Sequence, residues 1–238
     1  MKKQDNVLYD AHTSYGHLQV TETSYGNEPV RILEVNGQME SAVYLRPEKA
    51  DELVFPYTRL FGYPYALFPD LKRTLLIGGG GFMWPAWYLK HSEDRTIDTA
   101  EISPDIIQAA KQYFAGPEIF SDSRLRVIQD DGFKWLRESD EVYDVIINDA
   151  FIGSKDAGNT PADLRMIHEH LSAQGVYMVN TVSAAKGLFA WRGRRLLKAM
   201  HEVFANTEMI FCEDEDDVYR RQNLLIIASD RQLNTEEL

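Results

Sequence analysis

The chain has 238 residues, of which 44% are hydrophobic and 26% are charged, with one cysteine and a formal net charge of −12 at pH 7. This length and composition are those of a globular protein with one large core, or one core and a small appendage. The negative charge argues against nucleic-acid binding, because a phosphate backbone would be repelled.

The cellular environment is predicted from what the sequence lacks. No apolar run approaches the length of a membrane span, and the first residues lack the apolar core of a signal peptide. A single cysteine, Cys212, excludes an internal disulfide and a thiolate metal cluster. We therefore expect a cytoplasmic protein with no metal site and no membrane or nucleic-acid partner.

The N-terminal part, residues 1–50, predicts a small β-strand subdomain. Apolar and polar residues alternate over 17–23 and, roughly, over 30–35, which is typical of half-buried strands. Asn36-Gly37 is a strong hairpin signal and leads into a third strand over 39–45. Such a small antiparallel sheet is not stable alone and must pack on another element.

Residues 51–71 predict a linking helical segment. A helix start is expected near residues 49–51, but Pro56 and Pro64 interrupt the helical pattern. We expect this segment to deliver the chain to the first strand of a larger domain.

From residue 72 to residue 238, strands and helices alternate, which predicts a parallel sheet with helices on both faces. The predicted strands are 73–77, 96–101, 125–129, 144–148 and 175–181. Proline follows a helix-capping residue at Ser103 and Thr160, and Pro85 after Trp84 is expected to start a helix in the same way. Two final strands, 208–211 and 223–229, predict an antiparallel edge. The expected fold is an α/β, doubly wound Rossmann-like sheet.

The first parallel strand runs directly into four glycines, Gly78, Gly79, Gly80 and Gly81. Glycines at this position adopt backbone angles that side chains forbid and let a ligand approach the main chain. About twenty residues later the second strand ends in Glu101, an acid placed to accept hydrogen bonds from two ribose hydroxyls. This spacing predicts a nucleotide-sized site.

Other strand ends carry residues of the same kind, and in an open parallel sheet these ends form the ligand site. Asp131, Gly132 and Phe133 follow the third strand, and Asp149 follows the fourth. Asp131 can accept a hydrogen bond from an adenine amine, while Ile102 and Phe133 can flank the ring. The alternative for Asp131-Gly132 is a turn that caps a helix.

The sequence fits a nucleoside better than a pyrophosphate. The third glycine of a dinucleotide fingerprint would fall at Met83, and no phosphate-binding P-loop motif occurs. An acidic cleft without nearby Lys or Arg favours an uncharged or cationic nucleoside. We therefore expect a sulfonium donor, S-adenosylmethionine or decarboxylated S-adenosylmethionine, with methylthioadenosine as a related ligand.

Nearly the whole chain resembles the spermidine synthase (polyamine aminopropyltransferase) family. Short signatures match at Glu22-Thr23, Asn36-Gly37 and Asp51-Glu52. The longer segments that match are LLIGGGG, TAEISPDIIQAAKQYF, RLRVIQDDGFKWL and YDVIINDAF. The resemblance implies a class I methyltransferase fold, an adenosyl site in which Glu101 holds the ribose and Asp131 the adenine amine, and a homodimer.

Four departures from the family pattern concern the substrates. Gly81 stands where the family has an aspartate that grips the donor's amine, and Ile152 stands where a second aspartate binds the polyamine. Asp149 matches the first aspartate of that motif, which deprotonates the polyamine. Phe55-Pro56 replaces a Tyr-Gln pair, and Glu40 replaces a glutamine.

Loss of the aspartate at Gly81 removes a negative charge from the place where intact S-adenosylmethionine carries its carboxylate. We therefore predict a methyltransferase that acts on a small-molecule acceptor such as a cationic amine, with Asp149 orienting or deprotonating it. Transfer of an aminocarboxypropyl arm is compatible with the same residues. A divergent aminopropyltransferase and a catalytically silent adenosyl-binding protein are the alternatives.

Overall fold

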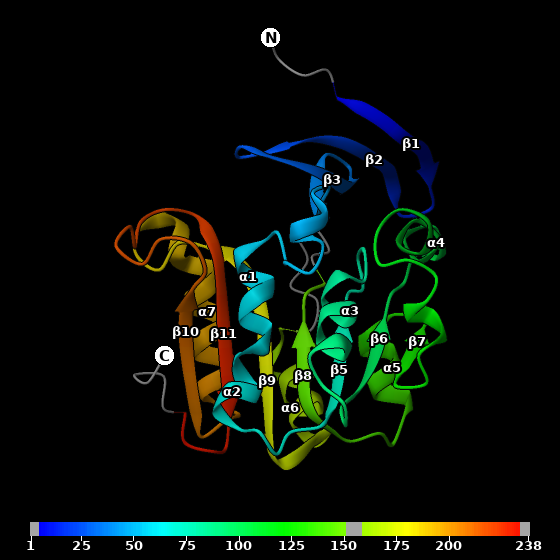
Figure 1. Cartoon of the computed structure of the whole chain (residues 1–238). Helices are drawn as coiled ribbons and strands as arrows, with labels where there is room; N and C mark the ends of the chain where they lie inside the picture. Colours follow the sequence, from blue (N-terminus) through cyan, green and yellow to red (C-terminus); the bar gives the residue numbers. More distant parts are fainter. Residues whose placement is uncertain (1–4, 151–158, 234–238) are drawn as a thin grey trace.

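The computed structural model describes residues 5–150 and 159–233, which form two sheets (Figure 1). The N-terminal sheet is antiparallel and follows chain order, with strands β1 (Asn6–Thr13), β2 (Gly16–Tyr25), β3 (Glu28–Val35) and β4 (Gln38–Tyr44). The hairpin predicted at Asn36-Gly37 joins β3 to β4, and both residues have positive φ, 53° and 75°. Strand β1 was not predicted, because its apolar positions are largely exposed or half-buried and their alternation is weak.

The linking segment is a series of short helical turns. They are η1 (Pro47–Lys49), α1 (Pro56–Arg59), η2 (Leu60–Gly62) and α2 (Tyr63–Leu67). The helix start expected near residues 49–51 is wrong, because Pro56 provides the first turn of α1 and Pro64 the first turn of α2. Proline thus begins these short helices, and it does not interrupt a long one.

The larger sheet has seven strands in the order β10-β11-β9-β8-β5-β6-β7. They are β5 (Arg73–Ile77), β6 (Thr96–Ala100), β7 (Leu125–Ile128), β8 (Tyr143–Asn148), β9 (Leu171–Ser183), β10 (Asn206–Phe211) and β11 (Gln222–Ser229). Strands β5 to β9 pair in parallel, whereas β10 and β11 form the predicted antiparallel edge. Strands β6 and β7 extend the sheet on one side of β5, whereas β8 and β9 extend it on the other side. A ligand site is expected at the carboxyl ends of β5 and β8, where the strand order changes direction.

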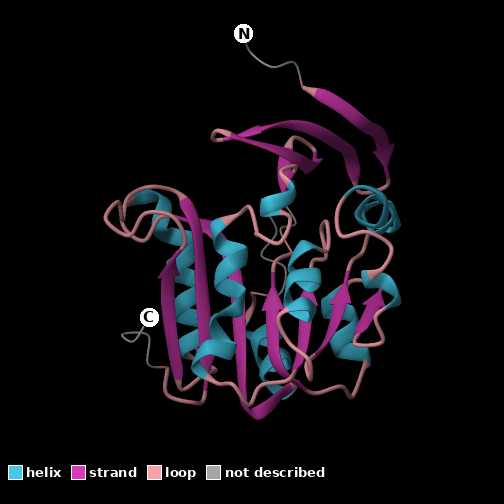
Figure 2. Cartoon of the chain, viewed as in Figure 1, coloured by secondary structure: helices cyan, strands magenta, loops and turns pink. Residues whose placement is uncertain are grey.

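Helices cover both faces of this sheet (Figure 2). The longer helices are α3 (Met83–Lys90), α4 (Pro104–Tyr113), α5 (Gly132–Glu138), α6 (Pro161–Glu169) and α7 (Trp191–His201). In β8, Val145 and Ile147 pack with α2 and α3, while Ile146 packs on the other face with α5, α6 and α7. Because both faces are buried, the central strands read as continuous apolar runs. The predicted fold class is confirmed.

Helix capping agrees with the sequence at two of three predicted starts. Ser103 Oγ accepts a hydrogen bond from the Ile106 amide, and Thr160 forms a capping box with Asp163. The start predicted at Trp84-Pro85 is wrong, because α3 begins at Met83 behind Phe82. Phe82 is fully buried and has a left-handed backbone, with φ 57°.

Helix α4 packs between the N-terminal sheet and the larger domain. On one side Ala109 packs against Leu18 and Leu33 of the N-terminal sheet, and on the other Ile107 packs against Phe82. This contact places the N-terminal sheet above the carboxyl ends of the central strands (Figure 1). No helix in residues 5–150 or 159–233 is long and apolar enough to cross a bilayer.

Candidate active site

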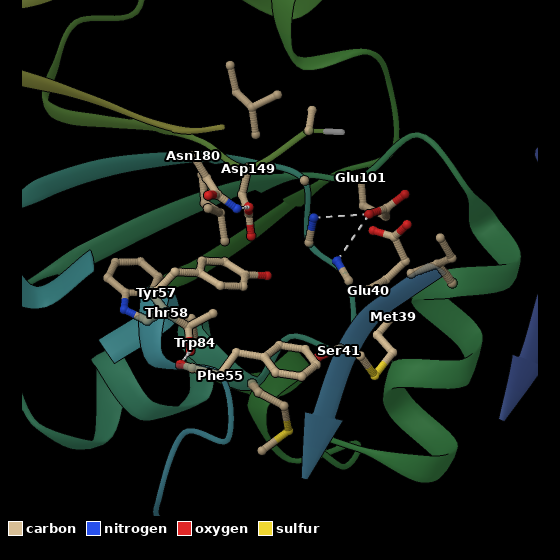
Figure 3. A pocket seen from close by; sticks show the side chains of 18 of the residues that line it. Met39, Glu40, Ser41, Phe55, Tyr57, Thr58, Trp84, Glu101, Asp149 and Asn180 are labelled. Carbon is tan, nitrogen blue, oxygen red and sulfur yellow. Dashed lines mark hydrogen bonds between the residues drawn. The ribbon is translucent and has the colours of Figure 1, made fainter. Parts of the chain in front are cut away.

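A cavity of about 970 Å³ opens between the N-terminal sheet, helix α1 and the carboxyl ends of β5, β6 and β8. Figure 3 shows its polar side chains in two groups, with Asp149, Asn180 and Tyr57 on one side and Glu101 and Glu40 on the other. The sheet's topology explains this position, because the cavity lies where the strand order reverses.

The glycine run brings the main chain to the floor of the cavity. Gly78 has φ 96°, and a Cβ there would lie 2.9 Å from the backbone oxygen of Asp149. Gly78, Gly79 and Gly80 line the cavity, as predicted. Gly81 does not appear in the lining, since it packs under strand β4, where a Cβ would lie 2.7 Å from Ser41 Oγ.

Glu101 is buried and holds the glycine loop. Its Oε2 accepts hydrogen bonds from the Gly79 and Gly80 amides at 3.0 and 3.2 Å, and its Oε1 accepts one from the Ser103 amide at 2.9 Å. Burial raises the pKa of Glu101, and these backbone bonds act in the opposite direction. A carboxylate oxygen accepts about two bonds, so Oε2 is taken up by the two glycine amides and Oε1 is the atom with room for a ribose hydroxyl.

Asp131 combines the two roles that the sequence left open. Its Oδ1 accepts hydrogen bonds from the Phe133 and Lys134 amides at 2.8 and 3.1 Å, which caps helix α5. Oδ2 has no hydrogen-bond partner within residues 5–150 and 159–233, and Asp131 lines the cavity. The side chain can therefore cap the helix and still accept a bond from a ligand.

The residues predicted to flank an adenine ring also lie in the cavity wall. Ile102 is 37% exposed there, whereas Phe133 is buried at 6%. Gly132 has a packing role as well, because a Cβ at this position would lie 2.7 Å from the Ile77 side chain. The strand-end residues Glu101, Ile102, Asp131, Gly132 and Phe133 thus share one cavity, as the sequence predicts.

Asp149 lies at the end of β8 and faces the cavity with two side-chain partners. Asn180 Nδ2 donates a hydrogen bond to Asp149 Oδ1 at 2.8 Å, and the Tyr57 hydroxyl donates another to the same carboxylate. Burial raises the pKa of Asp149 to about 7, against the opposing effect of these two bonds. A carboxyl with a pKa near neutrality is suited to general-base catalysis.

A second amide orients Asn180. Asn223 Nδ2 on β11 donates to Asn180 Oδ1 at 3.0 Å, so the Asn180 amide presents its NH₂ group to Asp149. Sequence reasoning missed both asparagines and Tyr57. Asn180 could have been found, because it lies near the end of β9 and the strand-end rule applies there too. Tyr57 and Asn223 carry no comparable signal.

Glu40 on β4 is a further acidic side chain in the cavity. Burial, followed by the charges of Asp149 and Glu101, raises its pKa to about 7. Phe55 also lines the cavity, and Pro56 begins helix α1 there. Ile152, the remaining departure from the family pattern, lies outside the described residues.

The acidic run 213–217 lies between β10 and β11. Glu213 reaches the cavity rim and forms an ion pair with Arg220 at 2.7 Å. Asp214 and Asp217 instead accept hydrogen bonds from nearby backbone amides. Most of the run therefore structures its own turn.

Comparisons with known proteins place this site in a family. Residues 55–211 match the model of the spermine/spermidine synthase domain. The polyamine aminopropyltransferase of Caldicellulosiruptor bescii is 30% identical over 187 residues, which cover 76% of this chain and 63% of that protein. Polyamine aminopropyltransferase 1 of Aquifex aeolicus is 27% identical over 74% of this chain and 61% of its own length. The chain thus spans less than two thirds of these relatives.

Solved structures share the fold. Spermidine synthase from Thermotoga maritima superposes with a TM-score of 0.75 at 21% identity, covering 95% of this chain and 73% of that one. Human methyltransferase-like protein 13 gives a TM-score of 0.58 at 22% identity, covering 76% and 83%. The larger sheet therefore has a methyltransferase-like fold, and the match over 55–211 shows that the chain belongs to the spermine/spermidine synthase domain family.

Proposed function

We propose that this protein is an aminopropyltransferase that moves the aminopropyl group of decarboxylated S-adenosylmethionine to the nitrogen of a small amine. The observation that carries the proposal is the position of Asp149, with its pKa of about 7, in the same cavity as Glu101 and Asp131. The family membership supports alkyl transfer over the methyl transfer that the substitutions alone had favoured.

In this proposal the donor lies along the strand ends. Glu101 Oε1 accepts a hydrogen bond from a ribose hydroxyl, and Asp131 Oδ2 accepts one from the adenine amine. Ile102 and Phe133 flank the ring, and the ligand approaches the main chain at Gly78–Gly80. This orientation directs the sulfonium toward the side of the cavity where Asp149, Asn180 and Tyr57 converge (Figure 3).

Asp149 prepares the acceptor. An aliphatic ammonium has a pKa near 10, so its nitrogen must lose a proton before it can attack. The raised pKa of Asp149 roughly halves the pKa gap that this transfer must cross. The nitrogen lone pair then forms a bond to the aminopropyl carbon that is attached to sulfur. That carbon–sulfur bond breaks, its electron pair stays on sulfur, and neutral methylthioadenosine leaves.

The test is a donor comparison. Purified protein is incubated with either decarboxylated S-adenosylmethionine or S-adenosylmethionine, together with a series of diamines and monoamines. We expect methylthioadenosine and an aminopropylated amine from the decarboxylated donor. Formation of S-adenosylhomocysteine from the intact donor would instead show methyl transfer. Absence of turnover with tight adenosyl binding would favour a silent binding protein.

The proposal extends to the assembly. We propose a homodimer in a cytoplasmic setting, because the family likeness favours one and Val7 and Tyr15 of the N-terminal region are 51% and 44% exposed. Light scattering should then give a mass of about twice the 27.3 kDa of the chain.

A further inference from the structure

Glu40 is a carboxylate in the cavity without a protein counter-charge. Within residues 5–150 and 159–233 it takes part in no hydrogen bond or ion pair, in contrast to Glu101 and Asp149. Its pKa is raised first by burial, then by Asp149 and then by Glu101. A partly buried carboxylate in this position is stabilised when a ligand brings a positive charge to it.

The backbone fixes where this carboxylate lies. Strand β4 crosses directly above the glycine loop, since a Cβ at Gly80 would lie 3.3 Å from the Glu40 backbone oxygen. The next residue, Ser41, is buried over Gly81. The backbone of Glu40 is thus held between the β3–β4 pairing and the glycine loop, which fixes the point from which its side chain enters the cavity.

The ionisable residues that line the cavity are mostly acidic. The carboxylates that line it are Glu40, Glu101, Asp130, Asp131, Asp149 and Glu213, of which Asp130 forms an ion pair with Lys134 and Glu213 with Arg220. Among the described lining residues one, Arg221, carries a positive charge, and its guanidinium lies over the Phe189 ring at 6.0 Å. The field in the cavity therefore favours cationic ligands and disfavours a ligand carboxylate.

The acidic side chains that could bind the donor and the acceptor lie on opposite sides of the cavity. Figure 3 shows Glu40 on the side of Glu101, across the cavity from Asn180 and Tyr57. In the proposed function Asp149 takes the acceptor nitrogen on that far side. The arm of the donor then extends into the cavity that Glu40 lines, where this carboxylate is available to its terminal ammonium.

We propose that Glu40 binds the ammonium group of the donor's aminopropyl arm and so selects the decarboxylated donor over intact S-adenosylmethionine. The intact donor would bring its carboxylate into the same anionic wall, where Glu40 repels it. This inference rests on the proposed function, because it assumes an adenosyl sulfonium in the cavity.

The experiment measures binding, not turnover. Calorimetry is performed with three ligands, decarboxylated S-adenosylmethionine, S-adenosylmethionine and methylthioadenosine, on wild type and Glu40→Gln. Methylthioadenosine lacks the amine and serves as the internal reference. Glu34→Gln is the matched control, since Glu34 lies on the adjacent strand β3 and outside the cavity lining. Thermal melts confirm that each variant folds.

We expect Glu40→Gln to weaken binding of the decarboxylated donor by at least about tenfold and to leave methylthioadenosine binding unchanged. The preference over S-adenosylmethionine should shrink by a similar factor, and Glu34→Gln should change neither. Equal weakening of the donor and methylthioadenosine would overturn the proposal, as it would show a role in the adenosyl site. An unchanged affinity for the decarboxylated donor in Glu40→Gln would also overturn it, because Glu40 would then make no contact with the ammonium of the arm.

Failure of the proposed function gives a different result. If wild type binds none of the three ligands, the adenosyl site itself is refuted. If wild type binds methylthioadenosine but discriminates between the two donors no better than Glu40→Gln, the site stands and the role of Glu40 is refuted.

Discussion

Asn180 donates a hydrogen bond of 2.8 Å to Asp149 Oδ1, and this bond lowers the pKa of Asp149 against the effect of burial. Asn180→Ala should therefore move the pKa of Asp149 further above about 7. Because the base acts only when deprotonated, the acid limb of the kcat profile should shift to higher pH. A kcat profile from pH 6 to pH 9 checks this.

Asn223→Ala tests the same effect on the pKa of Asp149 less directly. It removes the 3.0 Å bond that orients the Asn180 amide but leaves Asn180 in place, so the shift should have the same direction and a smaller size. A loss of kcat by the same factor at every pH in Asn180→Ala would contradict an effect on the base.

Asp149→Asn should abolish proton removal from the acceptor. The near-isosteric amide keeps the shape of the site, so methylthioadenosine should bind as in wild type while kcat falls by about 10²–10⁴-fold. Steady-state kinetics and calorimetry on the same preparation separate the two effects. Turnover close to that of wild type would show that another group takes the proton.

The role of Glu101 is best tested with a modified ligand and the unchanged protein. Glu101 holds the amides of Gly79, Gly80 and Ser103, so its substitution would disturb the loop as well as the site. Methylthioadenosine without its ribose hydroxyls should instead bind to wild type about tenfold more weakly, because a bond to a charged acceptor is lost. Equal affinity for both compounds would argue against a ribose contact.

Glu40 should also make stability depend on pH. Its pKa is raised from 4.5 to about 7 in the folded protein, so the folded state binds this proton more tightly than the unfolded state. The ionised Glu40 carboxylate therefore destabilises the folded state. This loss of stability is absent below pH 4.5, grows between pH 4.5 and about pH 7, and is complete above about pH 7. Glu40→Gln should therefore melt a few degrees higher than wild type at pH 8.

Wild type and Glu40→Gln should have the same melting temperature below pH 4.5, where wild-type Glu40 is protonated in both the folded and the unfolded state. Asp149 and Glu101 are coupled to Glu40 by charge, so loss of the Glu40 charge also eases their ionisation and contributes to the same pH-dependent difference. A difference in melting temperature that is constant across this range would contradict the titration of Glu40.

Gly78→Ala should destabilise the protein through two effects. The positive φ of 96° disfavours any side chain, and the new Cβ would meet the Asp149 backbone oxygen at 2.9 Å. We expect a loss of about 1–3 kcal/mol in the free energy of unfolding. Gly26→Ala is the control, since Gly26 has φ 60° but nothing within 4 Å. A similar loss in both variants would mean that the close contact contributes little.

The central strands were predictable because their physical signal is local. Leu75 and Ile77 in β5, like Val145 to Ile147 in β8, are buried on both faces and are therefore continuously apolar. The site residues Glu101, Asp131 and Asp149 followed from the same strands, since a parallel sheet brings consecutive carboxyl ends to one edge.

The contributions to the site from outside these strands were harder to predict. Tyr57 reaches Asp149 from a four-residue helix whose start is set by Pro56, in a segment without clear periodicity. Asn223 reaches Asn180 because β11 pairs with β9, which is a long-range contact that no local pattern encodes. For Glu40 the sequence revealed a substitution, but only the crossing of β4 over Gly80 shows where its charge lies.

The family segment 55–211 leaves out two of these residues. Glu40 precedes it and Asn223 follows it, yet both side chains line the same cavity. A protein trimmed to residues 55–211 would lose the wall that strand β4 provides and would lose Asn223 of the asparagine pair. Substitutions in the two flanking strands can thus alter which ligand the cavity prefers and leave the residues of the family segment unchanged.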